Sequence, residues 1–190
     1  MVTPQDMPAS LTPDHCHRLM PEWQDQDLTI TPLSGGITNR LYRVQTSAGI
    51  DCVVRIFGCK TELFIDRDAE KENILRLASS GVTTRLIKYL PEHQATIVEF
   101  VPGTPCTNAH FRDEQMLEKL VRPIRLIHES PCRLPKLFDP LREVIRLAAV
   151  VRDQCPDFPE VVLDGPIRCL EQLSDRARVS PSDSVPCPND

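Results

Sequence analysis

Apolar and polar residues alternate in short runs along the first half of the chain, as they do in β-strands. This alternation predicts strands over residues 27–33, 39–46, 52–57, 84–90 and 94–101. Between the third and fourth strands, residues 66–80 have helical spacing and stop before Gly81, a residue type that often closes a helix. The order of three strands, a helix and two strands predicts an antiparallel-rich α+β lobe.

The second half has the spacing of helices. Apolar side chains recur three and four positions apart over residues 113–128, and we expect further helices over 140–151 and 158–173. Pro123 should kink or split the first of these helices, and Pro166 interrupts the third. We therefore expect a flexible, proline-punctuated leader over residues 1–22, an N-terminal lobe over 23–103 and a partial helical C-terminal lobe over 104–190.

Composition narrows the class of protein. The chain has 190 residues, of which 41% are hydrophobic and 26% charged, and this is globular rather than disordered. A formal net charge of −5 weighs against a nucleic-acid partner, which needs a basic surface. The sequence contains no apolar run long enough for an integral membrane helix and no secretory signal pattern, so we expect a cytoplasmic protein.

The cysteines and histidines of the sequence raise the questions of disulfide bonds and of a metal site. The eight cysteines could form disulfides, but they are scattered and include no C-x-x-C pair, which favours free thiols in a reducing compartment. His15, Cys16 and His17 could ligate a metal, yet no second ligand pair lies nearby in the sequence. We therefore expect no metal site there.

The turn between the first two strands is the first candidate for chemistry. Gly35 and Gly36 are adjacent and are flanked by the hydroxyls of Ser34 and Thr38. Two glycines allow a sharp turn whose backbone N–H groups can hold phosphate oxygens. The alternative is a plain hairpin with a flexible tip.

A cation and a carboxylate follow the glycine turn in sequence. Arg55 shares a strand face with the apolar Val53 and Phe57, and it is costly there unless it is paired or lies at a water-facing edge. Glu70 shares the apolar face of the following helix with Ile74 and Leu77, so Arg55 is its obvious partner. The alternative for Glu70 is a solvated position near the helix N-terminus.

Glycine loop, strand cation and helix glutamate occur in the order found in protein-kinase-like nucleotide sites. Over longer stretches, GGITNRLYRV, VVRIFGCKTELFIDRDAE and IVEFVPG closely resemble the choline/ethanolamine kinase family. The second stretch is most similar to the ethanolamine kinase branch. The resemblance runs from about residue 27 to 190 and is strongest over 33–103.

This resemblance implies a protein-kinase-like α+β fold of the aminoglycoside phosphotransferase and choline kinase type. Such a fold has a five-stranded antiparallel, nucleotide-binding small lobe, here joined to an incomplete helical large lobe. It also implies transfer of the γ-phosphoryl group of ATP to ethanolamine or choline, with Mg²⁺. The ATP-binding residues that it implies are Ser34, Gly35, Gly36, Ile37, Thr38, Asn39, Arg40, Leu41, Arg55, Glu70, Glu99, Phe100 and Val101.

The implied roles differ along this set. The glycine-turn residues would cover the phosphates, Arg55 would contact phosphate and Glu70 would fix Arg55. Residues 99–101 would form the hinge that meets adenine. His128 matches a family histidine at the end of the first large-lobe helix, which we interpret as structural rather than catalytic.

The final residues, VPCPND, resemble the start of the family's catalytic loop. Asp190 matches the aspartate that accepts or orients the proton of the substrate hydroxyl, although Pro188 stands where the family has histidine, and a chance acidic end is the alternative. We expect the family's magnesium ligands and most of its amine pocket to lie beyond residue 190.

Four hypotheses remain open from the sequence. The leading one is an ethanolamine kinase, and the rival enzyme is a choline kinase. The third is an inactive nucleotide-binding module, and the fourth is an unstable fragment. The expected partners are ATP and a small amino alcohol, without nucleic acid or an integral membrane contact, and a dimer is left open.

Overall fold

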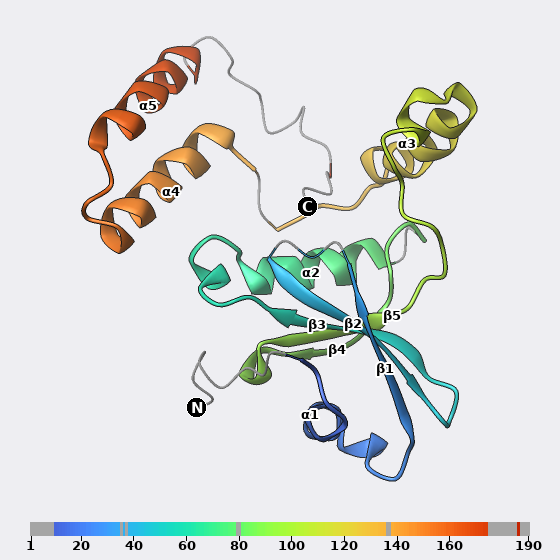
Figure 1. Ribbon diagram of the computed structural model, residues 1–190. Coiled ribbons are helices and arrows are strands. Elements are labelled where there is room, and N and C mark those ends of the chain that lie inside the picture. Colours follow the sequence, from blue (N-terminus) through green and yellow to red (C-terminus); the bar gives the residue numbers. More distant parts are fainter. Residues whose placement is uncertain are drawn as a thin grey trace.

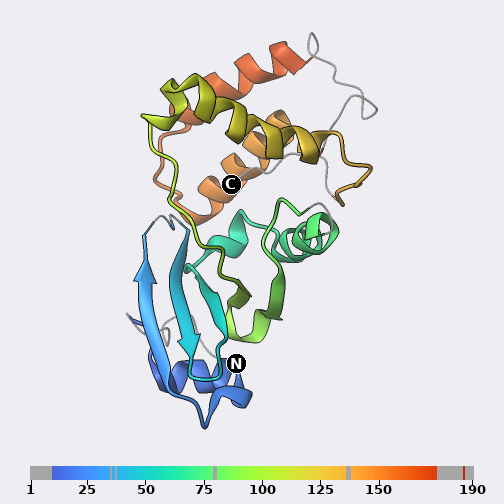
Figure 2. The same cartoon turned by 90° about the vertical axis from the view of Figure 1, so that its right-hand side faces the viewer.

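The computed structural model describes residues 10–34, 36, 38–78, 81–135, 138–174 and 186. A twisted sheet lies between two helical elements, with α1 on one face and α2 on the other (Figure 1). The helices of the second half all lie on the α2 side, as the view at a right angle also shows (Figure 2). The sheet therefore has one face toward α1 and another toward the rest of the chain.

The sheet has five antiparallel strands in the order β1-β2-β3-β5-β4. The strands are β1 (Leu28–Leu33), β2 (Asn39–Thr46), β3 (Asp51–Phe57), β4 (Leu86–Leu90) and β5 (Ala95–Glu99). The predicted five-stranded α+β lobe is thus confirmed, and its strands differ from the expected ones by only a few residues. β3 is central, between β2 and β5, with Leu41 of β2 opposite Arg55 and Thr96 of β5 on its other side.

The helix after β3 is shorter than predicted. α2 (Arg67–Leu77) begins where the Asp66 carboxylate accepts a hydrogen bond from the Ala69 N–H. This N-cap satisfies one of the amide groups that the first helical turn leaves unpaired. Gly81 has a φ of +70°, which suits glycine after a helix end. The expected residues 79 and 80 lie outside the described residues.

The prediction of a flexible leader is wrong for residues 10–22. They contain α1 (Pro13–Leu19), capped by Thr12, and the short 3₁₀ helix η2 (Pro21–Trp23). Both elements begin with a proline, a position where the missing N–H costs nothing. Residues 1–9 lie outside the described residues.

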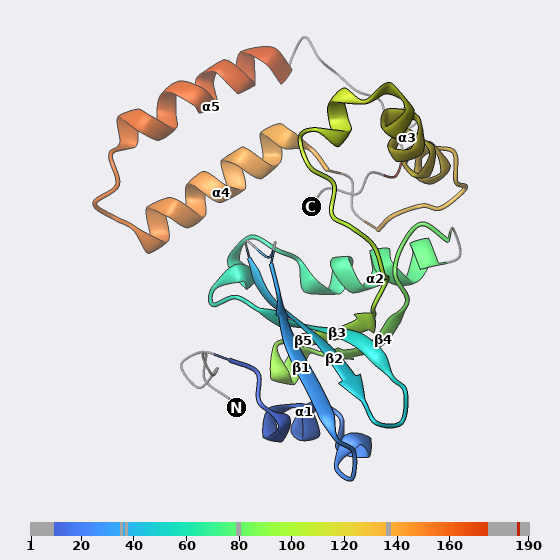
Figure 3. The same ribbon diagram turned by 45° about the vertical axis from the view of Figure 1, so that its right-hand side comes forward.

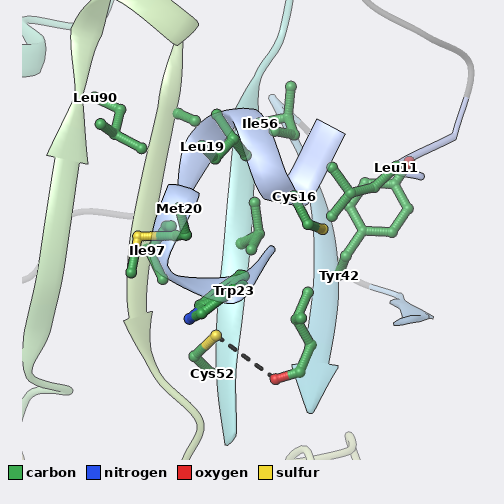
Figure 4. Close-up of a cluster of buried hydrophobic side chains, with 13 residues drawn as sticks. Leu11, Cys16, Leu19, Met20, Trp23, Tyr42, Cys52, Ile56, Leu90 and Ile97 are labelled. Atoms are coloured by element: carbon green, nitrogen blue, oxygen red, sulfur yellow. Dashed lines mark hydrogen bonds between the residues drawn. The ribbon is translucent and has the colours of Figure 1, made fainter. Parts of the chain in front are cut away.

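These elements bury an apolar stripe against the sheet, and this packing explains why residues 10–22 are folded. Its members are Cys16, Leu19, Met20 and Trp23, spaced as on one helix face. They pack on side chains from the outer face of the strands (Figure 4): Tyr42, Val44, Cys52, Val54, Ile56, Ala95 and Ile97. The main core of the lobe is thus on the face away from α2.

The second half forms three helices, α3 (Glu114–His128), α4 (Pro140–Gln154) and α5 (Glu160–Ser174). Pro123 lies inside α3 without splitting it, which excludes the split and leaves the kink as a prediction. Pro166 lies inside a continuous α5, so the predicted interruption there is wrong. α4 and α5 run side by side as an antiparallel pair (Figure 3). In the part of the chain that the structure describes, none of the helices combines the length and the apolar character that crossing a membrane requires.

Hydrogen bonds join the two halves, and one of them runs from the Arg76 guanidinium of α2 to the carbonyl oxygen of Arg133. The Arg146 guanidinium on α4 donates to the carbonyl oxygens of Leu63 at 2.7 Å and Phe64 at 3.2 Å. Lys60 donates to the side chain of Gln154 at 3.3 Å. These bonds join α4 to the loop between β3 and α2.

Replacing Leu19 by alanine should destabilise the fold by about 2–5 kcal/mol, because the side chain is buried under the sheet. Chemical denaturation followed by the fluorescence of Trp23, the single tryptophan, measures this change. The matched control is Leu173→Ala on α5, where the side chain is 56% exposed and the expected change is within about 0.5 kcal/mol. Equal effects would contradict the packing of α1.

The buried thiols should be the last to react with an alkylating reagent. Burial raises the pKa of Cys16 from 9.0 to about 12 and that of Cys52 to about 11. Their thiolates are therefore scarce at pH 8, whereas Cys59 and Cys106 are exposed. Timed iodoacetamide labelling with peptide mass spectrometry should show Cys59 and Cys106 modified first. Early labelling of Cys16 in the folded protein would contradict the structure.

The same raised pKa values make the fold sensitive to alkali. The thiols stay protonated in the folded state while the unfolded thiols ionise near pH 9, so their stabilising contribution is fully present below pH 9. It is lost progressively as the pH rises from about 9 through 11 to 12. Denaturation at pH 8 and pH 10.5 should show a smaller loss of stability in Cys16→Ala than in the wild type.

Candidate functional site

Two glycines allow close backbone packing at the start of β2. A Cβ atom on Gly36 would lie 2.1 Å from the Asn39 carbonyl oxygen, and one on Gly58 would lie 2.5 Å from that of Thr38. The Gly58 N–H donates to the Thr38 oxygen at 2.8 Å. The glycine turn is therefore tied to the loop that follows β3, and side chains at either position would force it open.

The other glycine-turn residues lie around this closure. Ser34 and Arg40 are exposed, and Thr38, Asn39 and Leu41 are half-buried. The Asn39 amide nitrogen donates to the Thr38 hydroxyl at 3.3 Å. Gly35 and Ile37 lie outside the described residues, as does Asp190. The described turn residues thus lead into β2, and those that are exposed lie outside the core.

Arg55 and Glu70 meet, as their positions in the sequence lead us to expect. A guanidinium nitrogen of Arg55 donates to Glu70 Oε1 at 2.9 Å, and each side chain is only 20% exposed. Because β3 is a central strand, the water-facing edge position for Arg55 is excluded. The pair joins the sheet to α2 on the face opposite α1.

Arg67 also contacts Glu70, and the sequence analysis did not single it out. Its Nη1 donates to Glu70 Oε2 at 2.8 Å, and its Nη2 reaches the side-chain oxygens of Asn39 at 3.2 Å and Thr61 at 2.7 Å. The guanidinium lies over the Phe57 ring, 4.0 Å from the centroid. The only sequence signal was a cation at the first position of a helix, where the helix dipole disfavours it.

Two of the three residues expected to form the hinge, Glu99 at the end of β5 and Phe100 after it, are held by hydrogen bonds. The Glu99 N–H donates to the Arg85 carbonyl oxygen at 2.9 Å, and its own carbonyl accepts from the Thr84 hydroxyl at 2.6 Å. The Phe100 N–H donates to the Asp51 carbonyl oxygen at 3.2 Å. Val101 is 65% exposed, and its backbone groups have no hydrogen-bond partner among the described residues. Of the three hinge residues, Val101 has its N–H and C=O available to a ligand.

A charged pair supports the hinge from the neighbouring strands. The Arg43 guanidinium binds both carboxylate oxygens of Asp51, at 2.8 and 2.6 Å, and lies 3.8 Å from the centroid of the Phe100 ring. The Arg43 guanidinium lowers the pKa of the Asp51 carboxyl through this hydrogen bonding. The ring of Phe100 thus packs on Arg43, which fixes the start of the hinge.

The remaining predictions from the sequence concern metal ligands and the histidines. Over the described ranges, no three His, Cys, Asp or Glu side chains come together as a metal site would require. His15 instead lies beside the Thr12 hydroxyl, with 2.6 Å between Nδ1 and Oγ1. His128 ends α3 and is half-buried.

Replacing Glu70 by glutamine should destabilise the protein by about 1–3 kcal/mol, because it leaves two half-buried guanidinium groups without a counter-charge. Urea denaturation measures the loss. The matched control is Glu72→Gln on the same helix, whose exposed pair with Arg76 should be worth at most about 1 kcal/mol. If the two variants lose equal stability, Glu70 does not centre the cluster.

Sequence comparison matches residues 30–156, more than half of the chain, to the family described as Choline/ethanolamine kinase. Human ethanolamine kinase 1 is 30% identical over 112 residues, which make up 58% of this chain and 24% of that protein. The chain therefore spans much less than the full length of this relative.

Solved structures show the same fold. An ethanolamine kinase of Plasmodium vivax has a TM-score of 0.64 at 17% identity, covering 85% of this chain and 50% of its own. The choline kinase LicA from Streptococcus pneumoniae has a TM-score of 0.66 at 22% identity, covering 86% and 57%, and has also been solved in complex with AMP. The fold is thus the expected protein-kinase-like one, and the chain belongs to the choline/ethanolamine kinase family.

Proposed function

We propose that the protein acts as an ethanolamine kinase, which transfers the γ-phosphoryl group of ATP to the hydroxyl of ethanolamine. The observation that carries this proposal is the Arg55–Glu70 pair beside the closed glycine turn, in a chain of this family. A strand cation fixed by a helix carboxylate is the arrangement that holds nucleotide phosphates in kinase-like sites. The products would be ADP and phosphoethanolamine.

The proposed roles follow from which groups are already paired. Glu70 engages one nitrogen of Arg55, so the other guanidinium N–H groups of Arg55 can bind phosphate oxygens. Backbone N–H groups of the glycine turn, residues 34–41, would cover the same phosphates. Val101 would offer its N–H and C=O to the adenine edge, because both backbone groups of Glu99 and the N–H of Phe100 are bonded within the lobe.

The transfer step needs a proton acceptor and charge neutralisation. The ethanolamine oxygen would attack the γ-phosphorus while the bond to the β-phosphate oxygen breaks, and Asp190 would take or orient the hydroxyl proton. Mg²⁺ would neutralise charge on the phosphates when it is bound. The described residues contain no cluster of three side chains that could hold it.

Ethanolamine is proposed over choline because the relatives that match in sequence are ethanolamine kinases, including the human protein. The likeness to LicA, at 22% identity, supports the fold and not the substrate. The different-class alternative is a nucleotide-binding module without transfer, which would keep the Arg55 site but give no product. We also propose a cytoplasmic location, in keeping with the unpaired thiols of the described cysteines.

A phosphoryl-transfer assay with labelled ATP and Mg²⁺, and with ethanolamine and choline as separate acceptors, tests the proposal. We expect labelled phosphoethanolamine, less product with choline, and loss of transfer in Asp190→Ala. Preference for choline would overturn the substrate. ATP binding without transfer to either amine would support the binding-module alternative.

A further inference from the structure

We propose that Arg67 is a positioning residue that locks the glycine turn to the Arg55–Glu70 pair and thereby sets the affinity for the phosphate groups of the nucleotide. The inference rests on the proposed function, because it assumes that phosphate binds beside Arg55. Arg67 lies outside the glycine turn and is not the strand cation, yet its side chain contacts α2, β2 and the loop after β3.

The two terminal nitrogens of the Arg67 guanidinium bind different partners. One terminal nitrogen of Arg67 binds Glu70 Oε2 at 2.8 Å, within α2. The other terminal nitrogen binds the side-chain oxygen of Asn39 at 3.2 Å, the first residue of β2. The same nitrogen binds the Thr61 hydroxyl at 2.7 Å, and that hydroxyl donates to the Gly58 carbonyl oxygen at 2.8 Å. A single guanidinium thus spans α2, the end of the glycine turn and the loop after β3.

This placement is costly for stability, which argues for a role beyond holding the helix. Arg67 is the first residue of α2, where the helix dipole disfavours a cation. Its side chain is only 11% exposed, and its buried Nε has no hydrogen-bond partner among the residues that the structure describes. Packing over Phe57 offsets part of this cost. A smaller polar residue at the helix start would avoid these penalties.

In this arrangement, Arg55 keeps guanidinium N–H groups for a phosphate ligand. Over the described residues, Arg67 binds Oε2 of Glu70, while Arg55 binds Oε1 through one of its nitrogens. Two guanidinium groups share one carboxylate, so the cluster carries a net positive charge, which suits a phosphate ligand. Through Asn39, whose amide bonds to Thr38, the same guanidinium fixes the turn that would cover that phosphate.

Lysine cannot reproduce this link, because an ammonium is a point charge without the planar fork of arginine. Arg67→Lys therefore keeps the charge and removes the bridging geometry. The matched control is Arg76→Lys on the same helix, where the arginine pairs with Glu72 on an exposed surface. The affinities for ATP and for adenosine, measured by calorimetry, separate phosphate binding from base binding.

We expect Arg67→Lys to weaken ATP binding by about tenfold, which corresponds to losing one charged hydrogen bond, and adenosine binding by less than about twofold. Amide hydrogen exchange at residues 38–41 should become faster in the absence of nucleotide. Arg76→Lys should change neither quantity. Unchanged ATP affinity, or equal weakening of ATP and adenosine, would overturn the inference.

The exchange measurement keeps this inference separate from the proposed function. If the wild-type protein binds neither ATP nor adenosine, the proposed function fails, and with it the role of Arg67 in phosphate affinity. Faster exchange at residues 38–41 in Arg67→Lys would then still show the structural link. Unchanged exchange would show that Arg67 does not hold the glycine turn, whatever the protein binds.

Discussion

The Glu70 carboxylate is the interaction on which the rest of this site depends. Its two oxygens bind guanidinium groups from different elements, Arg55 of β3 at 2.9 Å and Arg67 of α2 at 2.8 Å. Without that negative charge, the two cations would repel each other in a half-buried setting. With it, β3 and α2 are joined through one carboxylate, and Arg67 extends the link to Asn39 at the end of the glycine turn.

The sheet can support this charged cluster because one of its faces is apolar and the other carries charged side chains. The face toward α1 and Trp23 is apolar and supplies the main core of the lobe. The opposite face carries Arg43 with Asp51, and Arg55 with its partner on α2, and these ion pairs contribute less to stability than a packed core does. Helix α1 therefore supports the sheet that carries Arg55, although none of its residues touches the cluster.

Much of the fold could be predicted because alternation and helical spacing are local signals. The strands and the Arg55–Glu70 contact followed from such patterns, and so did the helix start near Asp66. Helix α1 was missed because its prolines, which stand at helix starts, were interpreted as signs of a flexible segment. Arg67 could not be found from the sequence, because its contacts with Asn39 and Thr61 depend on how three elements meet in space. The positions of Gly35, Ile37 and Asp190 lie outside the described residues.

The central claim is that the face of the sheet carrying Arg55 binds the nucleotide, with its phosphates beside the Glu70 cluster. Amide chemical-shift mapping during titration with ATP tests it most directly. The account predicts the largest shifts at residues 38–41, near Arg55 and at Val101, with little change in α1 and at Trp23 of η2. Shifts centred on α1 or on the helices of the second half, or none at saturating ATP, would contradict it.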